Sequence, residues 1–339
     1  MKKVLVAISG GVDSTVTAYL LQKEGYEIEG VYMKLHDSPP YHEKNIQNVK
    51  KVASYLGINY HILDLGERFN EAVFMPFIET YKKGLTPNPC VLCNRNIKLG
   101  ALLDFAKERG FDSLATGHYA QIKDGFIIEA VDKSKDQSYF LSYIKKEALN
   151  FMMFPLGEKI KEEDIKPLAA NIPILSEIAK QKESSEICFV EDSYLDILQQ
   201  HTNIDMPGDV LDEKGNIIGK HRGYMHYTIG QRKGFTLKVA HDPHYVIDIN
   251  AHKNQIVVGL RDALDIQKFE VKDLNMFIEE KEFEAYVKIR YRSPKTPCKI
   301  SIKGEKATIS LHQKVQGLAP GQVAVFYDEN RVLGSGWII

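Results

Sequence analysis

The sequence predicts an α/β protein whose N-terminal part forms a parallel β-sheet covered by helices and whose C-terminal part is built of β-strands. Three observations support this prediction. Short apolar runs alternate with segments of helical periodicity through the first half of the chain. From Pro207 onward, the chain changes to short strand-like runs separated by turn signals. The 339 residues are enough for two or three domains of roughly 100–200 residues each.

The elements of the first half follow one another in a regular order. Strands are expected over residues 2–9, 27–33, 58–65 and 112–120, the last together with the turn that follows it. Helices are expected between them over residues 13–23, 43–56 and 96–109, each ending near a glycine. Because parallel strands must be joined by crossover segments, these helices indicate a parallel sheet with both faces covered. Helical sequence continues to about residue 182, and residues 186–190 are predicted as one further strand.

The second half is predicted to be all β. Residues 208–221 are typical of a hairpin that turns at 214–216. Further strands are expected over residues 244–249, 255–260, 285–291, 298–302, 306–311, 323–327 and 332–339. We therefore expect an α/β domain over residues 1–200, a small β-rich central domain over 205–265 and a C-terminal β-barrel over 266–339.

The composition restricts where the protein works and what it binds. A net charge of −1 provides no general attraction to nucleic acid, so any RNA partner needs a local basic patch. No apolar run approaches the ~20 residues that span a bilayer. The short apolar run at residues 4–8 is followed by Gly-Gly and Asp, so we interpret it as a buried strand rather than a signal peptide. A cytoplasmic protein without a membrane partner is expected.

Two of the four cysteines lie close together, in the stretch TPNPCVLCNRNIK at residues 86–98. Cys90 and Cys93 have Cys-x-x-Cys spacing, which could bind a metal, form a disulfide or supply a nucleophile. Because cytoplasmic thiols stay reduced, catalysis or metal binding is favoured over a structural disulfide.

The junction between the first strand and the first helix is rich in small and polar residues. It reads Ser-Gly-Gly-Val-Asp-Ser-Thr over residues 9–15. Glycines allow close approach of the backbone, the amides at a helix start favour anions, and the hydroxyl groups add donors. An ordinary glycine-rich turn with a capping residue is the alternative. No GK[ST] follows the glycines, which excludes a Walker phosphate loop.

This strand–SGGVDS–helix arrangement resembles the PP-loop of ATP pyrophosphatases, which have a Rossmann-like adenine nucleotide alpha-hydrolase fold. The resemblance implies that ATP, with Mg²⁺, is cleaved between its α- and β-phosphates and adenylates a carbonyl or amide oxygen. Asp13 would be a candidate Mg²⁺ ligand. The residues implied in ATP binding are Ala7, Ile8, Ser9, Gly10, Gly11, Val12, Asp13, Ser14, Met33 and Gly117. They follow the carboxyl ends of predicted strands, where open α/β sheets bind ligands.

Further motifs select the substrate among such enzymes. TPNPCVLCN, ATGHYA, DQSYFL, ICF and YTIGQRKG occur in this order, and together they resemble the tRNA-specific 2-thiouridylase family over nearly the whole chain. The resemblance implies that the O2 of the wobble uridine of tRNA is adenylated and then replaced by sulfur from a cysteine persulfide. It makes Cys93 the nucleophile and Cys188 the persulfide carrier. Taken by its sequence alone, without the motif match, Cys188 is better explained as a small buried hydrophobe in a strand.

One position departs from the pattern of this family. Cys90 stands where the family usually has an aspartate, and a thiol has a reference pKa of ~8.5 rather than ~3.9. Either the reaction does not need that carboxylate, or the thiolate replaces it. A third possibility is that Cys90, Cys93 and Cys188 bind a [4Fe–4S] cluster. A zinc site is less favoured, because no second Cys-x-x-Cys or His pair completes four ligands.

The resemblance also implies which residues contact tRNA. Those that would contact the flipped target base are Asn88, Pro89 and Cys90. Those that would contact the rest of the tRNA are His118, Lys135, Asp136, Gln137, Tyr291, Arg292 and Gln322. Extruding the wobble base from its stack costs a few kcal/mol, so the base pocket must repay that cost.

A local basic segment supports an RNA partner. Residues 287–292 alternate apolar and basic, which predicts a strand with Lys288, Arg290 and Arg292 on one face. Between residues 288 and 306 there are seven basic residues and one acid, Glu305, a local charge of +6. A merely solvated face is the alternative, but three cations on one β-surface suit a phosphate backbone.

Two other functions remain open. Another PP-loop enzyme, such as a ligase or amidotransferase, would not need Cys93, Cys188 or the basic segment. A non-catalytic RNA-binding protein with a Cys-x-x-Cys metal knuckle would not need SGGVDS at a strand–helix junction. By resemblance, the sulfur comes from a cysteine desulfurase or sulfur-relay proteins, and the substrates are the tRNAs for Lys, Glu and Gln. No segment of the sequence identifies the donor or the preferred tRNA.

Overall fold

The computed structural model describes residues 1–36, 38–178, 187–190, 193–238 and 242–339. Contacts divide the chain into two compact units, and each is described separately. Unit 1 comprises residues 1–73, 90–184 and 330–333, and unit 2 comprises residues 74–89, 185–329 and 334–339.

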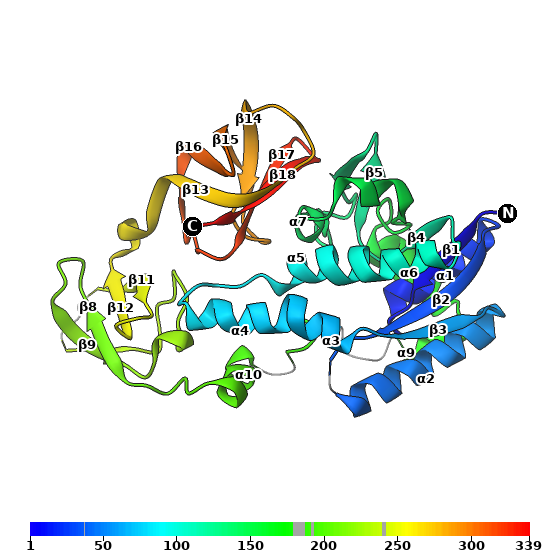
Figure 1. Ribbon diagram of the computed structural model, residues 1–339, viewed down its shortest axis with the longest axis horizontal. Helices are drawn as coiled ribbons and strands as arrows, with labels where there is room; N and C mark the ends of the chain where they lie inside the picture. Colours follow the sequence, from blue (N-terminus) through cyan, green and yellow to red (C-terminus); the bar gives the residue numbers. More distant parts are fainter. Residues whose placement is uncertain (37, 179–186, 191–192, 239–241) are drawn as a thin grey trace. The chain divides into compact units, whose positions relative to one another are not determined.

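Unit 1 is built on a five-stranded parallel sheet of order β3-β2-β1-β4-β7 (Figure 1). The strands are β1 Lys3–Ala7, β2 Glu27–Lys34, β3 Tyr60–Asp64, β4 Ser113–Ala115 and β7 Met152–Met153. Val4, Leu5 and Val6 of β1 are completely buried. Because β2 and β4 flank β1 on opposite sides, the strand order reverses at β1, and the ligand site of an open α/β sheet lies at such a switch point. The predicted parallel sheet is confirmed.

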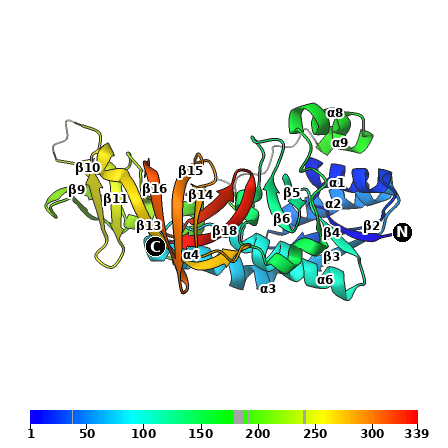
Figure 2. The same cartoon turned by 90° about the horizontal axis from the view of Figure 1, so that it is seen from above.

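Helices cover the sheet and complete the core of unit 1. They include α1 Val12–Lys23, α2 Pro39–Leu56, α8 Lys166–Ala170 and α9 Pro173–Ile178. Figure 2 shows α8 and α9 beside α1 and α2, in agreement with their contacts. Val16 and Leu21 of α1 and Val49 and Val52 of α2 pack in one apolar cluster with β1. Helix α2 begins four residues before its predicted start, because prolines are favoured in the first helical turn.

Two predictions for unit 1 are wrong. The helix expected over 96–109 begins earlier and has three parts: α5 Pro89–Cys93, a π-helical segment η2 Asn94–Ala101 and α6 Leu102–Glu108. A proline at the first helical position explains the early start, and it places Cys93 in a helix rather than in a loop. The region expected to continue as helix contains a hairpin, β5 Ala120–Lys123 and β6 Phe126–Glu129. Its turn is Asp124-Gly125, both with positive φ, as this hairpin turn requires.

The rest of unit 1 consists of short helical segments. They are α3 Gly66–Phe69, α7 Ser138–Leu141, η3 Lys146–Phe151 and η4 Lys161–Ile165, and η1 Asn70–Phe74 leads into unit 2. The predicted helix end near residue 182 lies outside the described residues.

The described residues of unit 2 include the α-helices α4 Met75–Lys82 and α10 Tyr194–His201, the short 3-10 helices η5 Tyr224–His226 and η6 Arg261–Leu264, and a five-stranded sheet of order β10-β9-β8-β12-β11. The strands of this sheet are β8 Gly208–Leu211, β9 Ile217–His221, β10 Thr236–Leu237, β11 Tyr245–Asn250 and β12 Gln255–Gly259. The hairpin predicted over 208–221 is confirmed as β8 and β9. Phe77 and Tyr81 of α4 pack against Val210, Val246 and Ile256 of this sheet.

The strand predicted over residues 186–190 is not formed in its described part. Residues 187–190 make a turn, in which Val190 N donates to Ile187 O at 3.0 Å. Glu186 lies outside the described residues.

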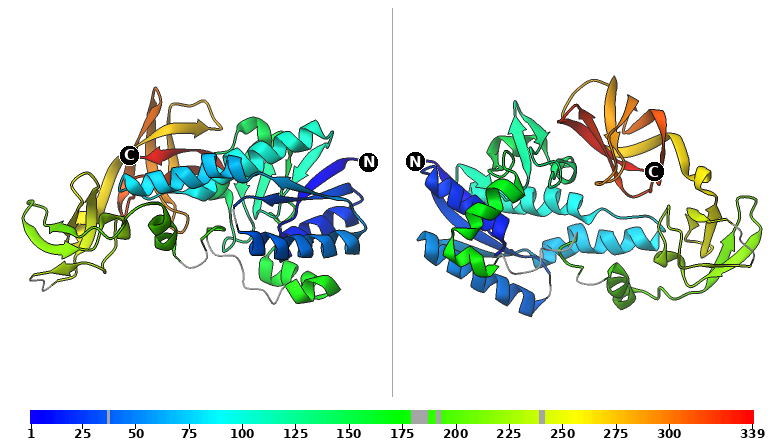
Figure 3. Two further views of the ribbon diagram at one scale, coloured as in Figure 1. Left: turned by 60° about the horizontal axis from the view of Figure 1, so that its bottom comes forward. Right: turned by 180° about the vertical axis from the view of Figure 1, so that it is seen from behind.

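The last strands close into the predicted β-barrel, yellow to red in Figure 3. The order is β13-β16-β15-β14-β17-β18, and pairing of β13 with β18 completes the ring. The strands are β13 Asp265–Met276, β14 Glu282–Lys288, β15 Thr296–Lys303, β16 Lys306–Gln316, β17 Val323–Asp328 and β18 Arg331–Ile338. Closure leaves no unpaired sheet edge. At the start of β18, residues 330–333 belong to unit 1, where Arg331 pairs with Ile128 of β6.

The strand predicted over 285–291 ends early, at Lys288. The amides of Ile289 and Arg290 donate to the hydroxyl of Ser293, each at 3.1 Å, and this turn replaces the strand ladder. The prediction that Lys288, Arg290 and Arg292 share one β-face is therefore wrong.

Among the described residues, no helix is both long and apolar enough to cross a membrane.

Candidate functional site

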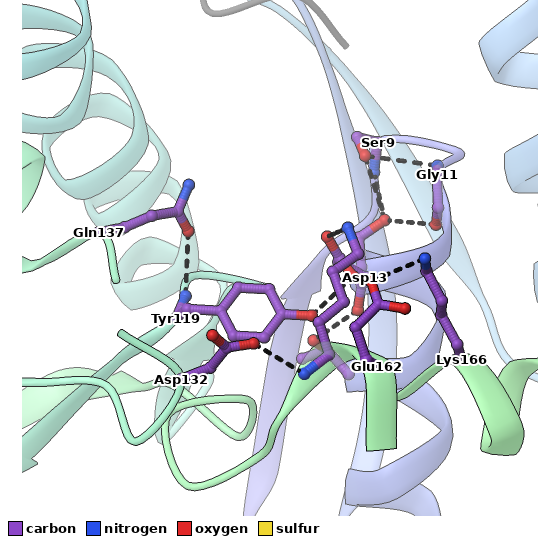
Figure 4. Close-up of polar contacts among 11 residues, drawn as sticks. Ser9, Gly11, Asp13, Tyr119, Asp132, Gln137, Glu162 and Lys166 are labelled. Carbon is purple, nitrogen blue, oxygen red and sulfur yellow. Dashed lines mark hydrogen bonds and ion pairs between the residues drawn. The ribbon is translucent and has the colours of Figure 1, made fainter. Parts of the chain in front are cut away.

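The loop between β1 and α1 is folded by its own hydroxyl groups. Ser14 Oγ accepts a hydrogen bond from Ser9 N and donates one to Gly11 O, both at 3.1 Å (Figure 4). Thr15 Oγ1 also donates to Gly11 O, at 2.9 Å. The amides of residues 12–14 precede the first helical bond, which runs from Thr15 N to Gly11 O at 3.3 Å. Such amides at a helix start suit an anion such as phosphate.

Two glycines bring other backbone segments close to this loop. Gly10 has φ +84°, and a Cβ there would lie 3.0 Å from Asn45 O. Gly117 follows β4, and its Cβ would lie 3.2 Å from Asp13 C and Ser14 N. Met33 lies near the end of β2 and is partly exposed. The residues predicted to bind ATP are thus brought together at the carboxyl edge of the sheet, and their role in binding stays a prediction.

Asp13 of α1 has two partners that the sequence did not indicate. Its Oδ1 accepts from the hydroxyl of Tyr119 at 2.9 Å, and its Oδ2 lies 3.1 Å from Lys161 Nζ (Figure 4). The Lys161 side chain is only 9% exposed, and its amide donates to Asp132 Oδ2 at 3.0 Å. A buried ammonium therefore lies beside the loop, where it can stabilise negative charge.

The same contacts bear on Mg²⁺. Both oxygens of Asp13 are already engaged, one of them by a cation. A divalent ion bound to Asp13 would share the carboxylate with the Lys161 ammonium and be repelled by its charge, so this arrangement disfavours Asp13 as a Mg²⁺ ligand. Tyr119 lies inside the ATGHYA motif, which could have pointed to it, whereas no sequence motif marks Lys161.

Three of the residues predicted to contact tRNA have partners within unit 1. His118 is buried, and its Nδ1 lies 2.7 Å from Thr116 Oγ1. Burial lowers the pKa of His118 well below the usual histidine value, and the charge of Lys98 lowers it further, so the ring stays neutral near pH 7. Gln137 Oε1 accepts from Tyr119 N at 3.0 Å and so fixes the tyrosine that holds Asp13 (Figure 4).

Asp136 is the third of these residues. Its buried carboxylate accepts from Ala130 N and Ser138 Oγ, both at 2.8 Å. Burial raises the pKa of Asp136 despite these hydrogen bonds. Lys135, beside it, is partly exposed. Asp136 therefore organises its loop, and the predicted tRNA contacts of this segment stay predictions.

The two cysteines of the Cys-x-x-Cys pair lie on one helix. Three positions apart on the helix, Cys90 and Cys93 project from the same side of α5, and Cys93 is only 5% exposed. The next two residues anchor this helix: Asn94 Nδ2 donates to Phe140 O at 3.0 Å, and the Arg95 guanidinium lies 4.4 Å from the Tyr143 ring centre. The π-helical segment begins here, and such segments are frequent at functional sites.

Cys188 is not the small buried hydrophobe that its sequence allowed. It is exposed, in the turn of residues 187–190 in unit 2. That description fits Cys298 instead, which is completely buried in β15, where burial raises its pKa to about 12. An accessible thiol such as Cys188 can accept sulfur from a donor protein.

Neither the sulfur-transfer pair nor the iron–sulfur cluster is settled by the fold. Cys90 and Cys93 belong to unit 1 and Cys188 to unit 2, so both assignments stay predictions. Within the part of the chain that the structure describes, no group of three or more His, Cys, Asp or Glu residues is arranged to hold a metal ion. The cluster therefore gains no support.

Within unit 2, two predicted RNA contacts lie next to each other. Asn88 is buried, and its Nδ2 donates to Gln322 Oε1 at 3.3 Å. Pro89, the other predicted base contact, begins α5.

The basic segment of the barrel carries less net charge than its sequence suggests. Lys299 pairs with Glu282 at 2.6 Å, and Lys306 lies 3.9 Å from Glu270. Both acids lie outside the window of residues 288–306, so counting within it overestimated the local charge. Arg292 is exposed in the turn after β14, and Lys288 lies over the Tyr291 ring at 5.6 Å.

Comparisons with known proteins cover the whole chain. A family model described as the tRNA methyl transferase HUP domain matches residues 2–192. The tRNA methyl transferase PRC-barrel domain matches residues 195–260, and the aminomethyltransferase beta-barrel domain matches 266–338.

Curated relatives match from end to end. A protein of Nitratiruptor sp. named tRNA-specific 2-thiouridylase MnmA is 56% identical over 338 residues, covering 100% of this chain and 99% of the relative. The protein of that name from Campylobacter lari is 58% identical and covers 99% of both chains. A third, from Aliarcobacter butzleri and named tRNA-specific 2-thiouridylase MnmA 1, is 53% identical and covers 99% of this chain and 98% of the relative.

Proposed function

The chain belongs to the tRNA-specific 2-thiouridylase family, and on this premise we propose that it catalyses ATP-dependent 2-thiolation of the wobble uridine of tRNA. The observation that carries the proposal is the loop between β1 and α1. The amides of residues 12–14 precede the first hydrogen bond of the helix, and the buried Lys161 ammonium lies beside them. This arrangement suits the pyrophosphate part of ATP. The α/β domain over residues 1–200 would be catalytic, and the β-barrel over 266–339 would bind tRNA; the matched ranges 2–192 and 266–338 support this division.

The first step of the proposed reaction activates the base. The uridine O2 attacks the α-phosphorus of ATP, the bond to the β-phosphate breaks, and pyrophosphate leaves. The loop amides and Lys161 stabilise the negative charge on the phosphates, which is the largest contribution that such a site offers to the transition state. A Mg²⁺ ion carried by the ATP phosphates would neutralise part of their charge. The product is a uridine whose O2 can leave as AMP.

The second step introduces sulfur. The outer sulfur of a Cys188 persulfide attacks C2 of the activated base, and AMP departs with O2. The Cys93 thiolate then attacks the Cys188 sulfur, so that the 2-thiouridine is released and a Cys93–Cys188 disulfide forms. A reductant must then reopen the disulfide before the next turnover. The exposure of Cys188 supports its role as the residue that receives sulfur from a donor protein.

The partners follow from this chemistry. We propose that the substrates are the tRNAs for Lys, Glu and Gln and that a cysteine desulfurase, directly or through relay proteins, supplies the sulfur in the cytoplasm. Asn88, Pro89 and Cys90 would contact the flipped base, and the exposed Arg292 after β14 would contact a phosphate.

One assay separates this function from its alternatives. The protein is incubated with ATP, unmodified tRNA, a cysteine desulfurase with cysteine as the sulfur source, and a thiol reductant, and AMP, pyrophosphate and 2-thiouridine are measured. We expect all three in equal amounts. AMP without 2-thiouridine would indicate another PP-loop enzyme, and tRNA binding without AMP would indicate a non-catalytic RNA-binding protein. A methylated base formed from a methyl donor would support the activity named in the first family description.

A single arginine tests the RNA surface. Arg292→Ala should weaken tRNA binding and lower the slope of log K against log salt by roughly 1, because one phosphate contact is lost. ATP binding should not change. Lys299→Ala is the matched control, since Glu282 already neutralises that lysine and its loss should change the slope less. Equal slopes for Arg292→Ala and the parent protein would show that Arg292 does not contact a tRNA phosphate, and the RNA-binding surface would then lie elsewhere on the protein.

A further inference from the structure

We propose that Gln322 is a positioning residue, whose side chain holds residues 86–88 in the conformation that receives the target base. The part of this inference that concerns the base rests on the proposed function. The family resemblance gives Gln322 a direct contact with tRNA. The contacts within unit 2 indicate instead that its side chain supports a segment of the protein itself.

Both ends of the Gln322 amide are engaged by one short segment. Its Nε2 donates to Pro87 O at 2.7 Å and to Thr86 O at 3.3 Å, and its Oε1 accepts from Asn88 Nδ2 at 3.3 Å. Thr86 N adds a bond to Pro320 O at 2.9 Å. Three consecutive residues are thus held by one side chain and the turn that carries it.

The segment needs such support because of its own sequence. Pro87 and Pro89 have no amide hydrogen, so the segment cannot use the backbone bonds of a helix or sheet. Its carbonyl groups still require donors when they leave water. Gln322 supplies two donors from a position 235 residues away.

The turn that carries Gln322 is shaped to receive the segment. Gly321 has φ +89°, and a Cβ there would lie 2.8 Å from Thr86 O and 3.0 Å from Leu85 Cβ. Gln322 is also fixed by its own backbone, because Ile338 N of β18 donates to Gln322 O at 2.9 Å. The amide therefore projects from a barrel strand end rather than from a mobile tail.

Because of these contacts, the conformation of residues 86–88 depends on the barrel. Asn88 is 7% exposed, and the residue after it, Pro89, begins the helix that carries Cys90 and Cys93. If tRNA contacts Gln322, it must share or replace the bonds to residues 86–88. RNA bound at this turn then changes the conformation of residues 86–88, which would receive the target base. The barrel therefore contributes to catalysis as well as to the affinity for tRNA.

Gln322→Glu tests the proposal, because glutamate keeps the size and the acceptor but loses both donors. Hydrogen exchange of the peptide covering residues 84–88 is measured in the protein alone, without ATP or tRNA. We expect exchange at Thr86 to become about tenfold faster or more, since a typical hydrogen bond contributes on that order. Gln313→Glu, an exposed change of equal charge on β16, should leave exchange at the parent rate. Gln322→Ala replaces the glutamate variant if that variant fails to fold.

The kinetic test separates positioning from RNA contact. Gln322→Ala should lower kcat for 2-thiouridine formation by about tenfold or more, with a smaller change in KM for tRNA. In a double-mutant cycle with Asn88→Ala, the double variant should lose little more than the worse single variant, because the two side chains act as one unit. Unchanged exchange at residues 84–88 together with a raised KM for tRNA would overturn the proposal.

A failure of the proposed function would look different. If the parent protein formed no 2-thiouridine, the activity assignment would fail, while the exchange measurement would still decide whether Gln322 holds the segment.

Discussion

Cys188→Ser will leave adenylation of tRNA intact and abolish 2-thiouridine formation. A serine cannot carry a persulfide, so the activated base receives no sulfur from the protein. Cys93→Ser should abolish release as well, because an alcohol is a far poorer nucleophile than a thiolate toward sulfur. We expect losses on the order of 10³-fold or more for each, as is usual when a covalent nucleophile is removed. Pyrophosphate release in a single turnover should stay near the parent value for both.

The other two cysteines serve as comparisons for this experiment. Cys298→Ala removes a thiol buried in the barrel and should leave turnover largely intact in the folded fraction. Cys90→Ser should retain measurable turnover, because Cys90 has a supporting role beside the nucleophile on α5. Cys90→Asp should approach the parent, because it restores the residue that the family usually has at this position. If a cluster were used instead, Cys90→Ser would lose iron and activity together. That result, in anaerobically prepared protein, would contradict the persulfide mechanism.

Lys161→Met should remove most of the ATP-dependent adenylation. Its ammonium lies 3.1 Å from Asp13 and its side chain is 9% exposed, so methionine would leave the Asp13 carboxylate beside the β1–α1 loop without its cation. We expect adenylation to fall by roughly 10²–10³-fold, the size usual for one preorganised electrostatic group. Asp13→Asn should also lower adenylation, because the Lys161 ammonium then loses the carboxylate that holds it in position. Pyrophosphate release with saturating tRNA is the measurement.

A neighbouring ion pair provides the matched control. Lys166 pairs with Glu162 at 2.7 Å, but both side chains are more than half exposed, at 54% and 65%. Lys166→Met is the same chemical change at an exposed pair, which is worth roughly 0–1 kcal/mol. Normal pyrophosphate release by Lys161→Met, or an equal loss in Lys166→Met, would contradict the assigned role of Lys161.

The parts of the fold that follow from local sequence could be predicted. Apolar runs such as residues 4–8 and the glycines of the first loop determine β1, α1 and the loop between them through nearby residues alone. The closed barrel likewise follows from repeated short strands and turns. The strand predicted over 285–291 ends early, because the Ser293 hydroxyl accepts hydrogen bonds from two backbone amides that the strand pairing would otherwise use.

The contacts that organise the site could not be predicted, because they join residues distant in sequence. Lys161 and Asp13 are 148 positions apart, and Asn88 and Gln322 are 234 apart. In neither pair does the sequence around one residue indicate which distant residue it will contact. The charge of the basic segment was overestimated for the same reason, since Glu282 and Glu270 come from other strands. The exposure of Cys188 also depends on a turn where the sequence indicated a strand.

The central claim is that ATP converts the uridine O2 into a leaving group that departs with AMP. The most direct test uses a tRNA transcript that carries ¹⁸O only at the O2 of the wobble uridine. After reaction with ATP and a sulfur donor, the mass of the AMP is determined and compared with the amount of 2-thiouridine. We predict one ¹⁸O-labelled AMP for each 2-thiouridine formed. Unlabelled AMP in the presence of 2-thiouridine, or ADP as the nucleotide product, would contradict the claim.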